Sequence, residues 1–172
     1  MILFLLLIIL CINLSTLEGI CVCPVNEIIS IQSIETEIKK QLSNIDNKIL
    51  YNKTPSGFVI SINNDLIFDS NECLNNTGKT ILTILSKTIK SSGRRWLILA
   101  HSNKEKDNEK NLFKTSIYAN IISSYLIEIE KCLINQIFPI GFGTIMPNKF
   151  VTSDFHEMHN RIDFVVEDFS LN

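Results

Sequence analysis

The sequence predicts an α/β (α+β) sandwich in which two helices cover one face of a mixed sheet. Short β-branched segments alternate with longer segments whose apolar residues recur every three or four positions, a pattern typical of strands alternating with amphipathic helices. The predicted order is strand, helix, strand, helix, strand, strand. The 172 residues suffice for one domain with a short extension, and a formal net charge of −2 gives no basic excess for nucleic acid.

The N-terminus begins with an unbroken apolar run at residues 2–12, ILFLLLIILCI. The run is shorter than the roughly 18 apolar residues that cross a bilayer, and it has the length of a signal-peptide core. We therefore expect residues 1–20 to be a signal peptide or an N-terminal membrane anchor. Cys21 is the candidate lipidation site. Because Ile20 precedes it instead of a small residue, a cleaved form without lipid is an equal alternative.

Residues 21–56 are predicted to form an amphipathic helical arm and a linker. Apolar side chains recur at steps of three and four from Ile31 to Ile49, which predicts a helix packed on its own domain or on a neighbouring subunit. The spacing is also nearly heptad, so a short coiled coil is the alternative. Residues 51–57 are rich in turn-forming residues, which places the start of the folded domain at residue 57.

The folded domain, residues 57–172, is predicted to begin with a strand at residues 58–62. A turn at residues 63–65 leads to a second short extended piece at residues 66–68. A helix follows, and Gly93 lies just beyond its end. Four apolar residues form the core-facing stripe of this helix: Ile81, Leu82, Leu85 and Ile89.

The next strand is predicted at residues 94–99, and it leads into the tetrapeptide Ala100-His101-Ser102-Asn103. After a charged loop, a helix begins near Asn111, and its predicted sheet-facing stripe is Ile117, Ile121, Tyr125 and Ile129. Residues 136–140 and 161–166 are the last predicted strands, joined by a loop at residues 146–159. A strand end that faces a helix start is where an α/β protein usually holds its ligand.

Five motifs in this order resemble those of the OmpA-like domain, the peptidoglycan-associating module of outer-membrane proteins, lipoproteins and flagellar stators. Ala100-His101-Ser102-Asn103 stands in place of the family's G-H-T-D, and residues 111–119 stand in place of N-x-x-L-S-x-x-R-A. The other motifs are Leu66–Ser70 with Gly78-Lys79, Gly141-Phe142-Gly143 with Pro147, and Asn160–Asp163. The resemblance covers residues 57 to about 168 and implies the family's β-α-β-α-β-β fold.

The resemblance also implies non-covalent binding of the peptide stem of peptidoglycan through its diamino acid. In the family an aspartate meets the amine of this ligand, and a forked arginine meets a carboxylate. Those two positions hold Asn103 and Tyr118 here, so the binding motif is degenerate. Hydrogen bonds to charged groups are stronger than neutral ones, and we expect binding to be weaker by about one to three powers of ten.

Other residues are expected to complete the peptidoglycan-binding site, and each has a structural alternative. His101 can instead be hydrogen-bonded at the strand end, and Asn111 can be a helix N-cap. Asp69 and Ser70 can serve only the geometry of their turn. Arg161 can pair with Asp163 as a structural bridge.

We expect a cell-envelope protein of the periplasm that contacts peptidoglycan and anchors or positions an envelope structure, attached to the outer membrane if lipidated. The alternative is a degenerate lipoprotein subunit of an envelope complex such as a type IVB secretion system, which binds proteins and not the wall. No enzymatic activity and no cofactor are expected, because neighbouring His101 and Ser102 point to opposite faces of a strand. His101, His156 and His159 lack metal-ligand spacing. Cys73 and Cys132 are expected to be unpaired and partly buried.

Overall fold

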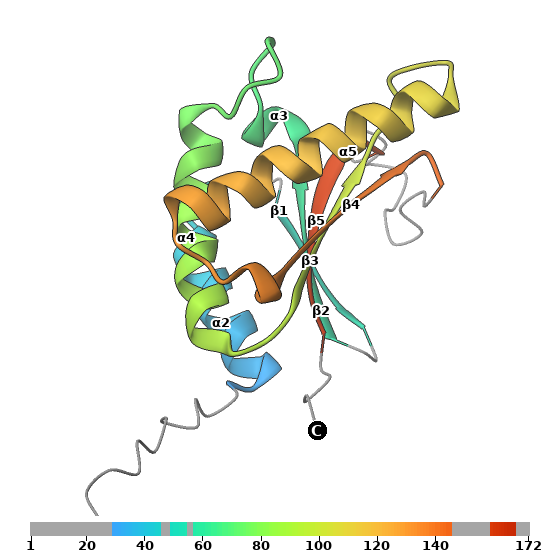
Figure 1. Cartoon of the computed structure of the whole chain (residues 1–172). Coiled ribbons are helices and arrows are strands. Elements are labelled where there is room, and N and C mark those ends of the chain that lie inside the picture. Colours follow the sequence, from blue (N-terminus) through green and yellow to red (C-terminus); the bar gives the residue numbers. More distant parts are fainter. Residues whose placement is uncertain (1–28, 46–48, 55–56, 146–158, 168–172) are drawn as a thin grey trace, which may run out of the picture.

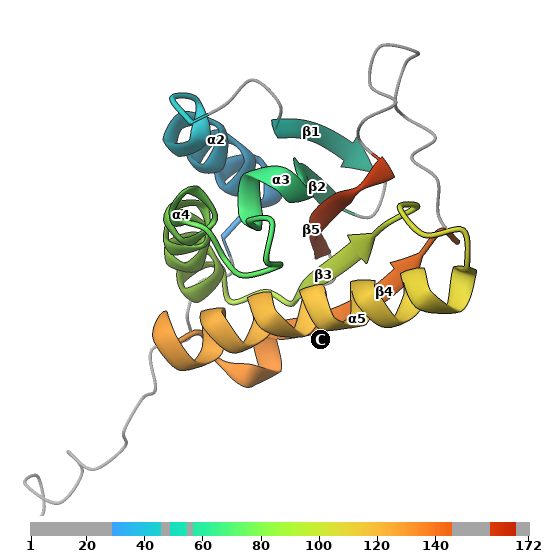
Figure 2. The ribbon, with the colours of Figure 1, turned by 90° about the horizontal axis from the view of Figure 1, so that it is seen from above.

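The computed structural model describes residues 29–45, 49–54, 57–145 and 159–167. The predicted signal or anchor, Cys21 and most of the predicted loop at residues 146–159 lie outside the described residues. Helices pack on one face of a five-stranded mixed sheet, which confirms the predicted sandwich (Figures 1 and 2). None of the described helices combines the length and apolar composition that crossing a membrane requires.

The sheet has the strand order β1-β2-β5-β3-β4. Its strands are β1 (Ile49–Thr54), β2 (Gly57–Asn63), β3 (Trp96–His101), β4 (Ile137–Gly143) and β5 (Arg161–Glu167). The β3–β4 pair is parallel, and the other neighbours are antiparallel. Alternate residues at matched register positions form the apolar inner face, as the period of two in a strand requires. These residues are Phe58, Ile60, Ile62, Trp96, Ile98, Ala100, Ile162, Phe164 and Val166, all 0% exposed.

Strand β1 corrects the predicted linker. Residues 51–54 form an edge strand paired with β2, with Tyr51 opposite Ile60. Residues 51–54, which the sequence assigned to a linker, thus belong to the sheet and do not mark the boundary of a domain. The Tyr51 ring also stacks on Phe58 with the ring centroids 6.2 Å apart. The sheet therefore begins before residue 57.

Helix α2 (Ile31–Leu42) packs on its own domain, as the sequence predicted in preference to a coiled coil. The Oγ of the N-cap Ser30 accepts a hydrogen bond from the Ser33 N–H at 3.2 Å. Ile34, Ile38 and Leu42 are at most 1% exposed and belong to the same core cluster as the sheet residues. The apolar face of the helix thus has its partner within the chain.

Helix α3 (Asn64–Ile67) replaces the predicted turn and most of the extended piece at residues 66–68. The Oδ1 of Asn63 caps this short helix by accepting from the Asp65 N–H at 2.9 Å, and Phe68 alone keeps an extended bridge, to Leu74. A cap residue at position 63 favours a helical turn locally, which the β-rich composition of the segment concealed.

Helix α4 (Asn76–Ser92) confirms the predicted first helix. The Asn75 Oδ1 accepts from the Gly78 N–H at 2.7 Å, and Gly93 ends the helix at φ +64° in the left-handed region. All four predicted core residues of this helix are 0% exposed: Ile81, Leu82, Leu85 and Ile89.

Helix α5 (Asn108–Ser124) continues into a π-helical turn at Tyr125–Ile129, and its predicted core stripe is wrong in phase. Ile117 is 40% exposed and Ile129 is 62% exposed, whereas Ile121 and Tyr125 are only partly buried. The core side instead carries Asn111, Thr115, Tyr118, Ala119, Ile122 and Leu126. Two of these six are polar and the opposite side carries isoleucines, so hydrophobic periodicity indicated the wrong face.

The thiols of Cys73 and Cys132 are both free, as predicted. Cys132 is 4% exposed, and burial raises the pKa of its thiol. Cys73 is exposed, so the expectation of partial burial was wrong for this residue. It lies in the loop before α4, where no other element covers it among the described residues.

Close packing of α5 on β4 depends on Gly141. A Cβ added at this position would lie 2.4 Å from the Ser116 backbone nitrogen. We expect Gly141→Ala to lower the free energy of unfolding by about 1–3 kcal/mol, because α5 must move away from the strand. Gly93→Ala is the control, since nothing lies within 4 Å of its added Cβ and only the left-handed φ opposes it, at about 1 kcal/mol. Equal losses for both variants in chemical denaturation would contradict this.

Candidate functional site

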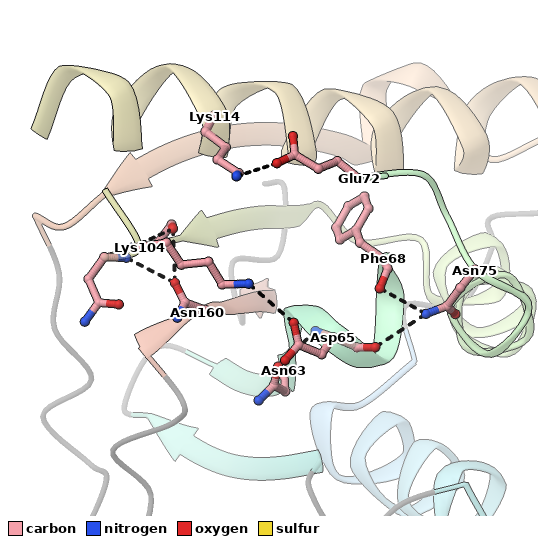
Figure 3. Close-up of polar contacts among 10 residues, drawn as sticks. Asn63, Asp65, Phe68, Glu72, Asn75, Lys104, Lys114 and Asn160 are labelled. Atoms are coloured by element: carbon pink, nitrogen blue, oxygen red, sulfur yellow. Dashed lines mark hydrogen bonds and ion pairs between the residues drawn. The ribbon is translucent and has the colours of Figure 1, made fainter. Parts of the chain in front are cut away.

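The carboxyl end of β3 is joined to the neighbouring strands by hydrogen bonds around Asn160. The Oδ1 of Asn160 accepts from the Ser102 Oγ at 3.0 Å and from the Asn103 N–H at 3.1 Å (Figure 3). The Ser102 N–H donates to the carbonyl of Gly143, at the end of β4, at 3.0 Å. Ser102 and Asn103, the two residues that follow β3, are therefore held in position by β4 and by the residue that precedes β5.

A cavity of about 180 Å³ lies at this end of the sheet. It is lined by His101, Ser102, Asn103, Gly143, Thr144, His159 and Arg161. Three residues of the predicted site, His101, Asn103 and Arg161, thus meet in one pocket. A cavity of this size admits a few waters or one small polar group, and it is smaller than the pockets that enclose a drug-sized ligand.

Two residues that line the cavity, His101 and Arg161, contact the buried carboxylate of Asp163. Nε of Arg161 donates to both carboxylate oxygens of Asp163, at 3.0 Å from each. Nε2 of His101 lies 3.1 Å from Oδ2 of the same carboxylate. Burial opposes ionisation of Asp163, but its contact with His101 and the charge of Arg161 together outweigh burial and hold the pKa of Asp163 below its usual value. The structural alternative is therefore correct for Arg161. His101 lies at the strand end with both ring nitrogens buried and without a hydrogen bond to any described residue, and both residues also line the cavity.

Tyr118, which occupies the family's arginine position, is buried. Its side chain is 5% exposed, and its ring stacks on Phe68 with the centroids 4.5 Å apart. Burial raises the pKa of its hydroxyl. Tyr118 therefore does not line the cavity with Asn103, because its ring completes the core between α5 and the α3–α4 loop.

The cation beside this stack is Lys114, one helical turn before Tyr118. Its Nζ forms an ion pair with Glu72 (Figure 3). The same nitrogen lies 5.8 Å from the centre of the Tyr118 ring. The ion pair raises the pKa of Lys114 and lowers the pKa of Glu72. A second, more exposed pair joins Lys104 to Asp65 at 3.4 Å. Cations and anions are therefore present near the expected site, and each already has a partner.

Asn111 is not available to a ligand, which corrects its predicted binding role. It is 0% exposed, its Nδ2 donates to the carbonyls of Glu105 and Asp107, and its Oδ1 accepts from the Glu105 N–H. The helix N-cap is Asp107, whose carboxylate accepts from the Glu109 N–H at 2.9 Å. The Asn111 side chain thus stabilises the loop before α5 through its hydrogen bonds to Glu105 and Asp107. It is neither the ligand-binding residue nor the helix N-cap that the sequence suggested.

Asp69 and Ser70 do not line the cavity. The Oδ1 of Asp69 accepts from the N–H groups of Asn71 and Cys73 at 2.9 and 3.0 Å. The carboxylate therefore forms its hydrogen bonds within its own turn. Both Asp69 and Ser70 are exposed. Turn chemistry, the structural alternative, therefore accounts for Asp69, and the structure brings neither residue to the pocket.

Sequence reasoning missed Lys114, Glu72, Thr144 and His159. Lys114 was detectable, since residues four apart on a helix share a face and Tyr118 had already been singled out. Glu72, Thr144 and His159 have no local signal, because loops bring them to the site from distant parts of the chain. Among the described residues, no group of three His, Cys, Asp or Glu side chains is placed to hold a metal ion.

No protein-family model and no curated protein matches the sequence. Solved structures do match the fold. A MotB-like protein from Desulfovibrio vulgaris has a TM-score of 0.64 at 13% identity, over 80% of this chain and 93% of that chain. The cell wall anchor of the T6SS from Pseudomonas aeruginosa has a TM-score of 0.61 at 14% identity, over 82% and 99% of the two chains.

The OmpA-like domain of FopA1 from Francisella tularensis subsp. tularensis SCHU S4 has a TM-score of 0.51 at 14% identity, over 69% of this chain and 79% of that chain. These likenesses span most of each matched structure and establish the OmpA-like fold for this chain. The fold implied by the sequence motifs is thereby confirmed.

Proposed function

We propose that this protein is a periplasmic envelope anchor whose strand-end face binds the peptide stem of peptidoglycan weakly and without covalent chemistry. The observation that carries the proposal is the cavity where His101, Asn103 and Arg161 meet, at the expected end of an OmpA-like sheet. The matched T6SS cell wall anchor and the OmpA-like domain of FopA1 support an anchoring role. A catalytic role is not proposed, because the Ser102 Oγ donates its hydrogen bond to the amide oxygen of Asn160 and not to a histidine.

Weak binding follows from the chemistry of the two altered positions. Asn103 offers an uncharged amide to the ligand's ammonium group, and the buried Tyr118 offers no fork to its carboxylate. Each neutral contact contributes about 1 kcal/mol, compared with about 1.5–3 kcal/mol for a charged one. We therefore expect dissociation constants in the millimolar range for a stem peptide that contains a diamino acid.

The second candidate function is a structural subunit that binds proteins and not the wall. Its support is the closed arrangement beside α5: Tyr118 fills its space against Phe68, and Lys114 is neutralised by Glu72. A zwitterionic ligand would have to separate that ion pair before either charge could contact it. In this alternative the OmpA-like scaffold has kept its fold and lost its ligand.

Co-sedimentation of the full chain with purified sacculi tests the proposal. We expect partial retention of the wild-type protein and stronger retention, by about tenfold or more, for the double variant Asn103→Asp with Tyr118→Arg, since the pair restores a charge for each end of the zwitterion. Either single variant should gain less, because it places one unmatched charge at the site.

A charge-matched control is Asn76→Asp with Thr80→Arg, two exposed positions on α4. This control should bind like the wild type. If neither the wild type nor a folded double variant sediments with sacculi, the anchor proposal fails and the protein-binding alternative gains. Micromolar wild-type binding would instead show that Asn103 and its neighbours are fully competent ligands.

A further inference from the structure

The segment that joins the π-helical turn to β4 exposes three large apolar side chains. Ile129, Leu133 and Ile134 are 62%, 61% and 76% exposed. Lys131, between them, has a left-handed backbone at φ +61° and ends the helical run that began with α5. The next residue, Cys132, is 4% exposed. The segment is therefore attached to the core and still presents an apolar surface to its surroundings.

Exposed cations lie beside these apolar side chains. Lys131 belongs to the same segment and is exposed. The exposed Lys90, near the end of α4, donates through Nζ to the carbonyl of Glu130 at 2.8 Å. The guanidinium of Arg95 lies 5.9 Å from the centre of the Phe138 ring, at the start of β4. We call these six residues the amino-end patch: Lys90, Arg95, Ile129, Lys131, Leu133 and Ile134.

The acidic residues of the same segment do not balance these cations. The carboxylate of Glu130 accepts hydrogen bonds from the hydroxyls of Thr83 and Ser86 on α4, so it is directed toward the protein. Glu128 is exposed. Among the described residues of this segment and its contacts, three exposed cations therefore accompany one exposed carboxylate.

The amino-end patch lies at the end of the sheet opposite the cavity. Arg95 immediately precedes β3, and Ile134 lies three residues before β4. The two strands are parallel, so their amino ends share one end of the sheet, from which both run upward in Figure 1. The N-terminal arm enters the domain at this same end, where Nε of Arg94 donates to the carbonyl of Ile29 at 2.9 Å.

The predicted membrane attachment lies a short distance before this entry. Eight residues separate Cys21 from Ile29, and a segment of this length spans at most about 29 Å when fully extended. A lipid on Cys21 would therefore hold the amino-end patch close to the bilayer. Exposed Leu and Ile between Lys and Arg side chains are typical of protein surfaces that insert shallowly among anionic lipid headgroups.

We propose that the amino-end patch docks on an anionic lipid surface. Leu133 and Ile134 lie at the boundary of the headgroups and acyl chains, and the three cations contact headgroup phosphates. The entry of the N-terminal arm and the excess of cations favour a lipid surface over a protein partner. The docked domain directs its cavity away from the membrane. This inference rests on the predicted N-terminal attachment and is independent of wall binding.

Tryptophan fluorescence tests the docking. The full chain with Leu133→Trp is reconstituted into vesicles of phosphatidylethanolamine and phosphatidylglycerol whose acyl chains carry bromine, a contact quencher. We expect at least about twofold quenching, because a docked side chain reaches the acyl boundary. The matched control is Phe113→Trp, since Phe113 is 71% exposed but lies near the start of α5, at the cavity end; it should show no quenching beyond that of the wild type. The natural Trp96 is 0% exposed and gives every variant the same background.

Charge reversal tests the contact with the headgroups. In the Leu133→Trp chain, Arg95→Glu with Lys131→Glu should reduce the quenching to that of the control, because the patch then repels anionic lipid. Lys106→Glu with Lys110→Glu changes two exposed cations near the start of α5 and should leave the quenching unchanged. Equal quenching at positions 133 and 113, or quenching that survives the reversal at positions 95 and 131, would overturn the proposal. Thermal melting of each variant confirms that lost docking is not lost folding.

Discussion

Replacing Asp163 by Asn is expected to lower the free energy of unfolding by about 3–5 kcal/mol. The carboxylate lies between Arg161 and His101, and all three residues are at most 7% exposed. The variant removes the carboxylate charge that lies 3.0 Å from Nε of the buried Arg161, and the neutral amide cannot offset this loss. Urea denaturation at neutral pH measures this loss.

Acid should remove the same contribution from the wild-type protein. The pKa of Asp163 is lower in the folded chain than in the unfolded chain, so the folded state is favoured while the carboxylate is ionised. This stability is complete above the unfolded value of about 3.9, and it is lost as pH falls through the lower folded pKa. The Asp163→Asn variant should therefore lose less stability than the wild type on acidification.

Asp65→Asn is the control for both measurements. The Asp65 side chain is 80% exposed, and its contact with Lys104 is a surface ion pair. Such pairs contribute about 0–1 kcal/mol, so this variant should unfold almost like the wild type. If Asp163→Asn behaves like Asp65→Asn, the Arg161–Asp163 pair is not the structural centre of this end of the sheet.

Ile122→Ala should cost about 2–5 kcal/mol, because the side chain is 0% exposed and its loss leaves a cavity between α5 and the sheet. Its neighbour Ile121 is only partly buried, so Ile121→Ala should cost roughly 1 kcal/mol, in proportion to the smaller area withdrawn from water. Urea denaturation of both variants compares them directly. A larger loss for Ile121→Ala would restore the phase that the isoleucine spacing predicted.

The predicted site shows where sequence reasoning was sufficient and where it was not. His101, Asn103 and Arg161 were expected at one site, and all three line the cavity at the end of β3, while their role in binding stays a prediction. Asn111 and Tyr118 matched positions of a family motif, but position in a motif does not reveal whether a side chain is exposed. Both are buried here: Asn111 binds the loop before α5, and Tyr118 packs on Phe68.

Local patterns in the sequence were enough for the order of the main elements and for the core face of α4. Each depends on residues close along the chain: alternation in β2, the spacing of Ile81, Leu85 and Ile89, and the Gly93 helix end. Burial on such an element follows from its own periodicity, because one face of α4 is apolar and the other is not.

Tertiary packing settled which side of α5 is inside, that β1 joins the sheet, and that Lys114 meets Glu72. Helix α5 is apolar on two sides, so its sequence is compatible with either orientation. The close approach of β4 at Gly141 selects the side that carries Thr115 and Ile122, and the Thr115 hydroxyl then accepts the Gly143 N–H at 3.0 Å. Partners far apart along the chain supply these constraints, and a local pattern contains no information about them.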